Sequence, residues 1–109
     1  MELPRRVVWL GDSRTNLQAF PQAVRRDMGA ALFAAQRGQT AQHVKPFYRI
    51  AERYATNAFR LIYAVQLGKS IYVLHVFQKK SKSGSTTPKM DVDLIMKRYK
   101  EARERAKNE

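Results

Sequence analysis

Four side chains whose chemistry suits a phosphate lie in two apolar segments joined by a short turn: Arg60, His75, Phe77 and Lys79. Arginine and lysine hold a phosphate and stabilise the charge that develops on it. Histidine exchanges protons near neutral pH, and phenylalanine stacks on a base. Together they meet the requirements for cleaving RNA through attack of a 2′-hydroxyl on the neighbouring phosphate. Simpler interpretations stay open, because a charge within a strand usually faces solvent and a histidine or phenylalanine there usually packs in the core.

A hairpin of two strands would bring these side chains together. The segment Ala58–Val65 alternates large apolar residues with a second set, and Ile71–Phe77 is rich in β-branched and aromatic residues. The turn residues Leu67–Ser70 predict an antiparallel pair in which Arg60 lies near Val76. The large side chains that need a core are expected on one face: Phe59, Leu61, Tyr63, Tyr72, Leu74 and Val76. The opposite face then carries all four candidate residues.

Further basic residues follow the second strand. The segment Gln78–Thr87 consists mainly of lysine, serine, glycine and threonine, which predicts a loop. Lys79, Lys80 and Lys82 leave the strand there, within reach of a ligand held by Arg60. A lysine-rich loop is usually only solvated, but this crowding at a strand end favours a role in binding phosphate.

The first half of the chain predicts a short strand followed by two helices. The strand is expected over Val7–Leu10, and the first helix over Ser13–Ala19. The second helix begins at Pro21, whose missing N–H costs nothing there, and ends at Gly38. Its apolar stripe consists of Val24, Met28, Ala31, Leu32 and Ala35. The polar segment Gln39–Pro46 predicts a loop.

The second half adds strands and a last helix. Phe47–Tyr54 is compatible with a strand, although its alternation is poor. Thr87 is expected to cap the last helix, with Pro88 as its first residue and Asp91 near the positive end of the helix dipole. The apolar stripe of this helix consists of Val92, Ile95, Met96, Tyr99 and Ala102. The sequence thus predicts one α+β domain over residues 1–109.

The composition indicates a polyanionic partner. The 109 residues include 21 Lys and Arg against 9 Asp and Glu, which gives a formal charge of +12. The absence of cysteine excludes a disulfide scaffold, a Cys-ligated zinc site and a thiol nucleophile. The two histidines have no metal-ligand spacing, so we expect neither a metal nor another cofactor. No stretch approaches the roughly 20 apolar residues of a membrane span, and no signal peptide is evident, so we expect a cytoplasmic protein without membrane contact.

Two strand motifs and a dipeptide resemble a known family. Phe59–Tyr63 follows the pattern aromatic-Arg-x-x-Tyr, and Tyr72–Lys80 follows Tyr-Val-Leu-His-x-Phe-x-Lys-Lys. Thr87 and Pro88 supply the Thr-Pro that precedes the last helix. Over about residues 5–105 the chain resembles the RelE/ParE toxin superfamily, and within it the HigB-like branch of phage-derived toxins.

This resemblance implies a fold and a function. The fold would be an N-terminal helical hairpin packed on a small twisted antiparallel sheet, with a C-terminal helix. The function would be that of a toxin in a type II toxin–antitoxin pair, whose antitoxin usually has a helix-turn-helix domain. Most characterised HigB- and RelE-like members cleave mRNA in the ribosomal A site, where mRNA and ribosomal RNA are the partners. ParE-like members instead poison DNA gyrase.

The resemblance also assigns residues by position. Arg60 matches the strand arginine that contacts the scissile phosphate in RNA-cleaving members. Lys79 and Lys80 stand where those members place a second basic residue, usually an arginine, so lysine must serve here. The predicted catalytic residues are Arg60, His75, Lys79 and Lys80. The predicted RNA-binding residues are Arg53, Tyr54, Phe77 and Lys82, with a core position as the alternative for Tyr54.

Three functions remain in competition at this point. The leading hypothesis is a metal-independent, ribosome-dependent endoribonuclease that blocks translation. The alternative is a non-cleaving protein of the same fold that acts on gyrase or only binds its antitoxin. A third is an RNA-binding module without toxicity. The combination of arginine, histidine and lysine favours cleavage, since a protein that only binds does not need phosphate-holding groups to converge.

Overall fold

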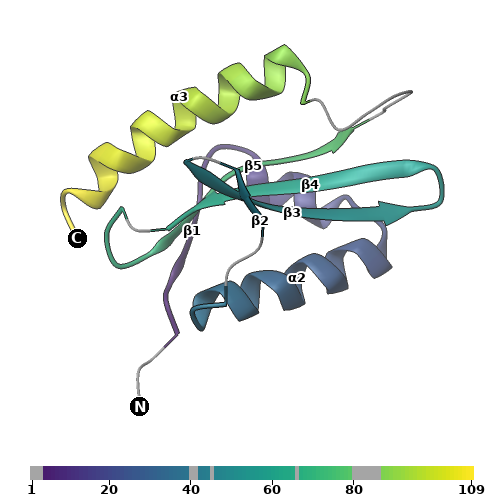
Figure 1. Ribbon diagram of the computed structural model, residues 1–109, viewed down its shortest axis with the longest axis horizontal. Helices are drawn as coiled ribbons and strands as arrows, with labels where there is room; N and C mark the ends of the chain where they lie inside the picture. Colours follow the sequence, from purple (N-terminus) through teal and green to yellow (C-terminus); the bar gives the residue numbers. More distant parts are fainter. Residues whose placement is uncertain (1–3, 40–41, 45, 66, 80–86) are drawn as a thin grey trace.

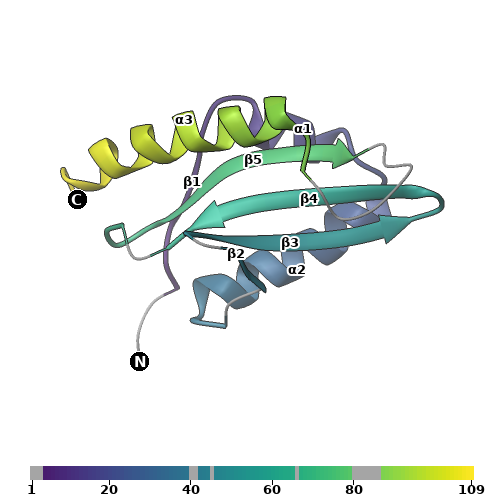
Figure 2. The ribbon, with the colours of Figure 1, turned by 45° about the horizontal axis from the view of Figure 1, so that its top comes forward.

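In the residues that the structure describes (4–39, 42–44, 46–65, 67–79 and 87–109), three helices flank a five-stranded sheet (Figure 1). The structure is a computed structural model. The strands are β1 (Val7–Trp9), β2 (Gln42–Val44), β3 (Phe47–Tyr54), β4 (Asn57–Ala64) and β5 (Ile71–Lys79). The helices are α1 (Ser13–Gln18), α2 (Gln22–Gln36) and α3 (Lys89–Ala106). Helix α2 lies on one face of the sheet and α3 on the other (Figures 1 and 2), which confirms the predicted α+β class.

The sheet is mixed, with the strand order β1-β5-β4-β3-β2. Strands β2 to β5 pair antiparallel with their neighbours, whereas β1 lies parallel to β5. The predicted loop Gln39–Pro46 is wrong for Gln42–Val44, which form the short edge strand β2 against β3. Three residues are too few to show the period-two alternation by which a strand is recognised in a sequence.

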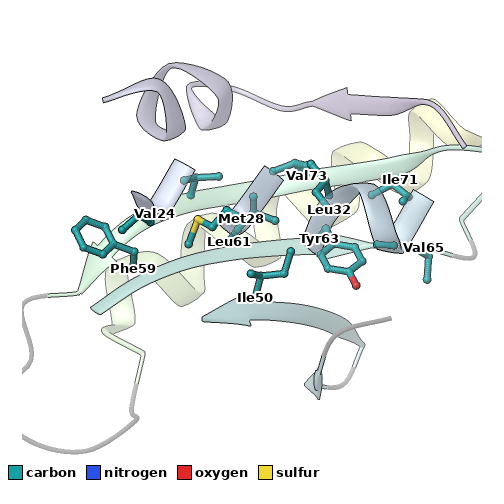
Figure 3. Close-up of a cluster of buried hydrophobic side chains, with 12 residues drawn as sticks. Val24, Met28, Leu32, Ile50, Phe59, Leu61, Tyr63, Val65, Ile71 and Val73 are labelled. Carbon is teal, nitrogen blue, oxygen red and sulfur yellow. The ribbon is translucent and has the colours of Figure 1, made fainter. Parts of the chain in front are cut away.

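A hydrophobic cluster fills the space between α2 and the sheet (Figure 3). Val24, Met28, Leu32 and Ala35 of α2 are buried, as the helical spacing predicts, and Ala31 packs beside them. The buried residues that meet them from the sheet side are Ile50, Phe59, Leu61, Tyr63, Val65, Ile71, Val73 and Val76. Helix α2 begins one residue later than predicted, because Pro21 is its N-cap. Gly38 has φ +93°, which suits the predicted helix end.

A second cluster lies beneath α3 on the opposite face. Its buried members are Leu10, Phe47, Ile62, Ala64, Tyr72, Leu74, Phe77, Ile95, Ala102 and Ala106. The predicted stripe of α3 is only partly covered: Ile95 and Ala102 are buried, but Val92 is 40% and Met96 41% exposed. Within the described part of the chain, no helix is long and apolar enough to cross a membrane.

A β-bulge interrupts the pairing of β4 with β5. Ile62 lies opposite His75, but the next residue, Tyr63, lies opposite Val73. Leu74 is therefore an additional residue on β5. Leu74 belongs to the cluster beneath α3, and His75 contacts α3 directly, so two consecutive side chains project to the same face. A bulge of this kind shifts the alternation of the strand by one residue.

The bulge changes the predicted division of β5 between the two faces. Strict alternation predicts Tyr72 and Leu74 on the same face as Phe59, Leu61 and Tyr63, which is the face that α2 covers. This prediction is wrong, because both pack beneath α3. Val76, beyond the bulge, faces α2 as predicted. Arg60 lies opposite Phe77 rather than near Val76. The bulge thus lets one strand supply apolar residues to both cores and still present its polar residues beside Arg60.

Candidate functional site

Cross-strand pairing gathers cations on the α3 face of the sheet. Residues directly opposite each other in antiparallel strands project to the same face, so rows run across β3, β4 and β5. The rows are Arg53–Ala58–Lys79, Ala51–Arg60–Phe77 and Arg49–Ile62–His75. Four basic side chains therefore share this face, and we call them the basic cluster: Arg49, Arg53, Arg60 and Lys79.

Arg60 is a buried cation within the basic cluster. It is 6% exposed, and its Nη1 donates a hydrogen bond of 3.2 Å to Oγ1 of Thr87. Burial lowers the pKa of the Arg60 guanidinium, and the nearby charge of Arg49 lowers it further. Because arginine nevertheless stays charged at neutral pH, a bound anion would offset a charge that the site disfavours. Thr87 serves Arg60 and does not cap α3 as predicted, since Pro88 holds the N-cap position without a side-chain hydrogen bond.

Lys79 is the second buried cation, at the end of β5. It is 5% exposed. Burial lowers the pKa of the Lys79 amine, and the charges of Arg60 and Arg49 add to the effect. An amine with a lowered pKa is neutral in a larger fraction of molecules, and it can then accept a proton. The end of β5 therefore holds an amine whose charged form the surroundings disfavour.

His75 has both ring nitrogens engaged. Its Nε2 lies 2.7 Å from Oδ1 of Asp91, and its Nδ1 lies 3.4 Å from Nη1 of Arg98. A guanidinium only donates, so we assign Nδ1 as the acceptor and Nε2–H as the donor to the carboxylate. The ring also stacks on Phe77, with centroids 4.7 Å apart and planes 14° from parallel. In this arrangement His75 joins β5 to α3, and both of its ring nitrogens face side chains of α3.

Arg98 extends this contact to the N-terminal part of the chain. Its Nη1 donates to the carbonyl oxygen of Leu74 at 3.0 Å, and its Nη2 donates to Oδ1 of Asp12 at 2.9 Å. This hydrogen bond holds the pKa of the Asp12 carboxyl below its ordinary value, against an opposing effect of burial. Gly11, at φ +54°, leaves room for the guanidinium, because a Cβ there would lie 2.4 Å from Nη2 of Arg98. We call the chain of contacts Asp12–Arg98–His75–Asp91 the α3 clamp.

The structure brings together some of the predicted residues and separates others. Arg53 is exposed on the same face as Arg60 and Lys79. Phe77 is 7% exposed and packs in the cluster beneath α3, so its ring is not open to a base. Tyr54 alternates onto the opposite face, opposite Asn57, and is 47% exposed. It is therefore neither in the basic cluster nor in the core. The predicted residues Lys80 and Lys82 lie outside the described residues.

Sequence reasoning missed four residues that shape the site: Arg49, Thr87, Asp91 and Arg98. Arg49 lies in a strand with poor alternation, and only the register against β4 places it beside Arg60. Asp91 and Thr87 lie near the start of α3, where an acidic residue and a threonine are already expected as part of a helix N-terminus. The Thr-Pro dipeptide followed by an acidic residue marks the helix start, but it carries no signal for the partners on the sheet.

A comparison with protein families decides the class of the molecule. The family model "Phage derived protein Gp49-like" matches residues 15–100, which is most of the chain. The chain belongs to the Gp49-like family. This is a RelE/ParE-like toxin family of toxin–antitoxin systems, so the Gp49-like protein has an antitoxin as its implied partner. No curated protein and no solved structure matches the chain.

The matched range contains helix α2 and strands β2 to β5, but not β1. The range shared with the Gp49-like family includes all four residues of the basic cluster, and it includes His75, Asp91 and Arg98 of the α3 clamp. Asp12 lies before the matched range. The resemblance of the two strand motifs to RelE/ParE toxins is thereby confirmed at the level of the toxin family.

Proposed function

We propose that this Gp49-like toxin is a ribosome-dependent endoribonuclease of the HigB-like branch, which cleaves mRNA and stops translation in the cytoplasm. Its partners would be mRNA and ribosomal RNA on the ribosome, and an antitoxin with a helix-turn-helix domain. The observation that carries the proposal is the burial of Arg60 and Lys79 beside Arg49 on one face of the sheet. Positive charges held close together and away from water favour a ligand with phosphate groups.

The chemistry would be transfer of a phosphodiester within the RNA. The 2′-oxygen forms a bond to phosphorus while the bond from phosphorus to the 5′-oxygen breaks. The 2′-hydroxyl loses its proton to a base, and the departing 5′-oxygen takes up a proton. The products are a 2′,3′-cyclic phosphate and a 5′-hydroxyl end, and no metal or cofactor enters the scheme.

The residues would divide these tasks among them. Arg60, assisted by Arg49, would hold the non-bridging phosphate oxygens and stabilise their growing charge, because a guanidinium can donate two parallel hydrogen bonds. Lys79 would accept the proton of the 2′-hydroxyl, as its lowered pKa allows. Lys80, Lys82 and Arg53 would contact neighbouring phosphates. His75 would act as a positioning residue, since both of its nitrogens already have partners.

Expression without the antitoxin tests the proposal. Wild-type protein should arrest growth, and pulse labelling should show protein synthesis falling before DNA synthesis. Arg60→Met keeps the buried stem and removes the charge, so it should abolish toxicity while the melting temperature stays near that of the wild type. Removing one donor of this kind costs roughly 10²–10³ in rate. Arg26→Met, on the exposed side of α2, is the matched control and should remain toxic.

An assay with purified components identifies the RNA ends that cleavage produces. Ribosomes carrying mRNA and treated with wild-type protein should yield fragments with 2′,3′-cyclic phosphate and 5′-hydroxyl ends. DNA synthesis falling first, with intact mRNA, would indicate a gyrase poison and would refute the proposal. A toxic Arg60→Met variant would show that the site is elsewhere.

A further inference from the structure

A pocket opens between the N-terminal half of α3 and the sheet, next to the basic cluster. Its volume is about 240 Å³, and its lining comes from β3, β4, Thr87 and α3. The lining residues are Phe47, Arg49, Ile62, Thr87, Val92, Ile95 and Met96. We propose that this pocket binds one unstacked base of the RNA, beside the phosphate that Arg60 holds. The inference rests on the proposed function, since it assigns part of the same RNA substrate.

The size of the pocket suits a single ring system. Pockets that bury a whole small molecule have volumes of roughly 300–1,000 Å³, and this one is smaller. The walls of Ile62, Val92, Ile95 and Met96 are aliphatic, and such walls accept the face of a base. Single-stranded RNA is recognised through unstacked bases, which are often packed against apolar side chains or arginine planes.

The polar side chains of the pocket carry donors. Arg49 has only N–H groups, and the Thr87 hydroxyl, whose oxygen accepts the hydrogen bond from Arg60, also has an O–H to donate. Ring nitrogens and carbonyl groups on the edge of a base are acceptors that match such donors. An apolar side chain from a partner protein would fill the same space but would offer these donors no acceptor. The donors therefore favour a base over an apolar side chain.

The pocket is continuous with the phosphate site. Arg49 and Ile62 lie in the row next to Arg60, which is two residues, or about 7 Å, along the strands. The sugar of one nucleotide joins a base to its phosphate over a gap of this kind. Thr87 belongs to both places, because it lines the pocket and receives the hydrogen bond of Arg60. A base in the pocket would thus fix which phosphate reaches Arg60 and Lys79.

The test combines a filled pocket with an RNA that lacks one base. Val92 is 40% exposed and lines the pocket, so Val92→Trp should fill it from the solvent side. Met90 is 85% exposed on the same helix and does not line the pocket, which makes Met90→Trp the matched control. The substrate is ribosome-bound mRNA carrying an abasic residue at each position around the cleavage site in turn. Thermal melts confirm that the variants fold, and Met96→Trp serves as a second filled variant.

We expect one abasic position to slow cleavage by wild-type protein on the order of tenfold, because a stacked base contributes about that factor. Val92→Trp should slow cleavage of the intact mRNA by a similar factor and should no longer respond to that abasic position. Met90→Trp should behave as the wild type.

Uniform tolerance of abasic residues by the wild type, or a Val92→Trp variant that responds as the wild type does, would overturn the inference. Normal cleavage by Val92→Trp together with lost antitoxin binding would assign the pocket to the partner protein instead. No cleavage of intact mRNA by wild-type protein would be the failure of the proposed function, and it is distinct from these results.

Discussion

The surroundings of Lys79 disfavour the positive charge on its amine. Burial lowers the pKa of its amine, and the nearby guanidinium groups of Arg60 and Arg49 lower it further. At pH values between this lowered pKa and the ordinary 10.5, the unfolded chain binds more protons than the folded one. The contribution of Lys79 to the free energy of unfolding therefore rises with pH across that window. The same feature that suits the lysine to accept a proton makes it a burden on the folded state.

Replacing Lys79 by methionine should separate stability from activity. Lys79→Met removes the disfavoured charge and keeps an unbranched side chain, so its melting temperature at pH 7 should exceed that of the wild type. The difference should shrink as the pH rises through the lowered pKa of Lys79. Cleavage should fall by roughly 10²–10⁴, the usual contribution of a positioned base. Melts from pH 7 to pH 10 and cleavage assays measure both effects.

The control for this experiment is Lys89→Met. Lys89 lies on the surface of α3 in an exposed ion pair with Asp93, so its removal should change neither the pH dependence of stability nor the rate. A Lys79→Met protein that melts below the wild type at pH 7 would show that the contacts of the amine outweigh the cost of burying its charge.

At the scale of the elements, the α3 clamp holds the last helix against β5. The clamp links the Asp12 carboxylate, the Arg98 guanidinium, the His75 ring and the Asp91 carboxylate in one chain of contacts. The clamp fixes the first turns of α3, and Thr87 just before them positions the guanidinium of Arg60. A substitution of His75 should therefore affect the site although every residue of the basic cluster remains in place.

We expect His75→Leu to loosen the start of α3. Asp91 would lose its donor and Arg98 one acceptor, at a cost of roughly 1–3 kcal/mol in the free energy of unfolding. Amide hydrogen exchange should become faster in the first two turns of α3, and cleavage should slow. His75→Gln, which can still donate to Asp91, should restore part of both. Lys89→Ala, which breaks only an exposed ion pair, should leave exchange in these turns close to that of the wild type.

The pH profile distinguishes positioning from proton transfer. If His75 only positions α3, the slower His75→Gln variant keeps the shape of the wild-type profile of rate against pH. If one limb of the profile disappears with the ring, His75 transfers a proton and the assignment made from its two contacts is wrong.

The elements differ in how far the sequence reveals them. The stripe of α2 follows a helical period of apolar residues, and each of its buried members is recognisable. The face shared by Arg60, His75 and Lys79 also follows from alternation. The bulge at Leu74 does not, because apolar residues fill both sides of β5 and the alternation gives no sign of the shift. Arg49 was not predicted for a related reason, since its position beside Arg60 follows from the register between β3 and β4 and not from the residue pattern of β3.

For the molecule as a whole, both the net positive charge and the position of particular cations should contribute to binding RNA. The net charge is +12, and in the part of the chain that the structure describes the buried lysine and arginine side chains, Lys79 and Arg60, both belong to the basic cluster. Distributed surface charge attracts a polyanion from a distance, whereas the cluster would neutralise particular phosphates. The salt dependence of RNA binding, compared between the wild type and single variants, separates the two contributions.

Binding of single-stranded RNA should weaken steeply with salt. If the four residues of the basic cluster each neutralise one phosphate, the plot of log K against log salt should have a slope of about −3, at roughly −0.7 for each contact. Arg60→Met should reduce the slope by about one contact, and Arg25→Met, on α2, should change it little. Fluorescence anisotropy with a labelled oligonucleotide measures both slopes. A slope near zero would mean that phosphates do not drive binding.

The bulge at Leu74 also bears on how this chain can change over generations. It separates β5 into a first part that pairs with Tyr63 and Ala64 and a second part that pairs with Arg60 and Ile62. Leu74 is the additional residue, so loss of its codon would bring the Tyr63–Val73 and Ile62–His75 pairs into one continuous register. The side chains before and after it would keep their faces, and the deletion would cost the buried side chain of Leu74 alone. A lineage can therefore lose this bulge in one step without exchanging the core face of β5 for the face that carries the site.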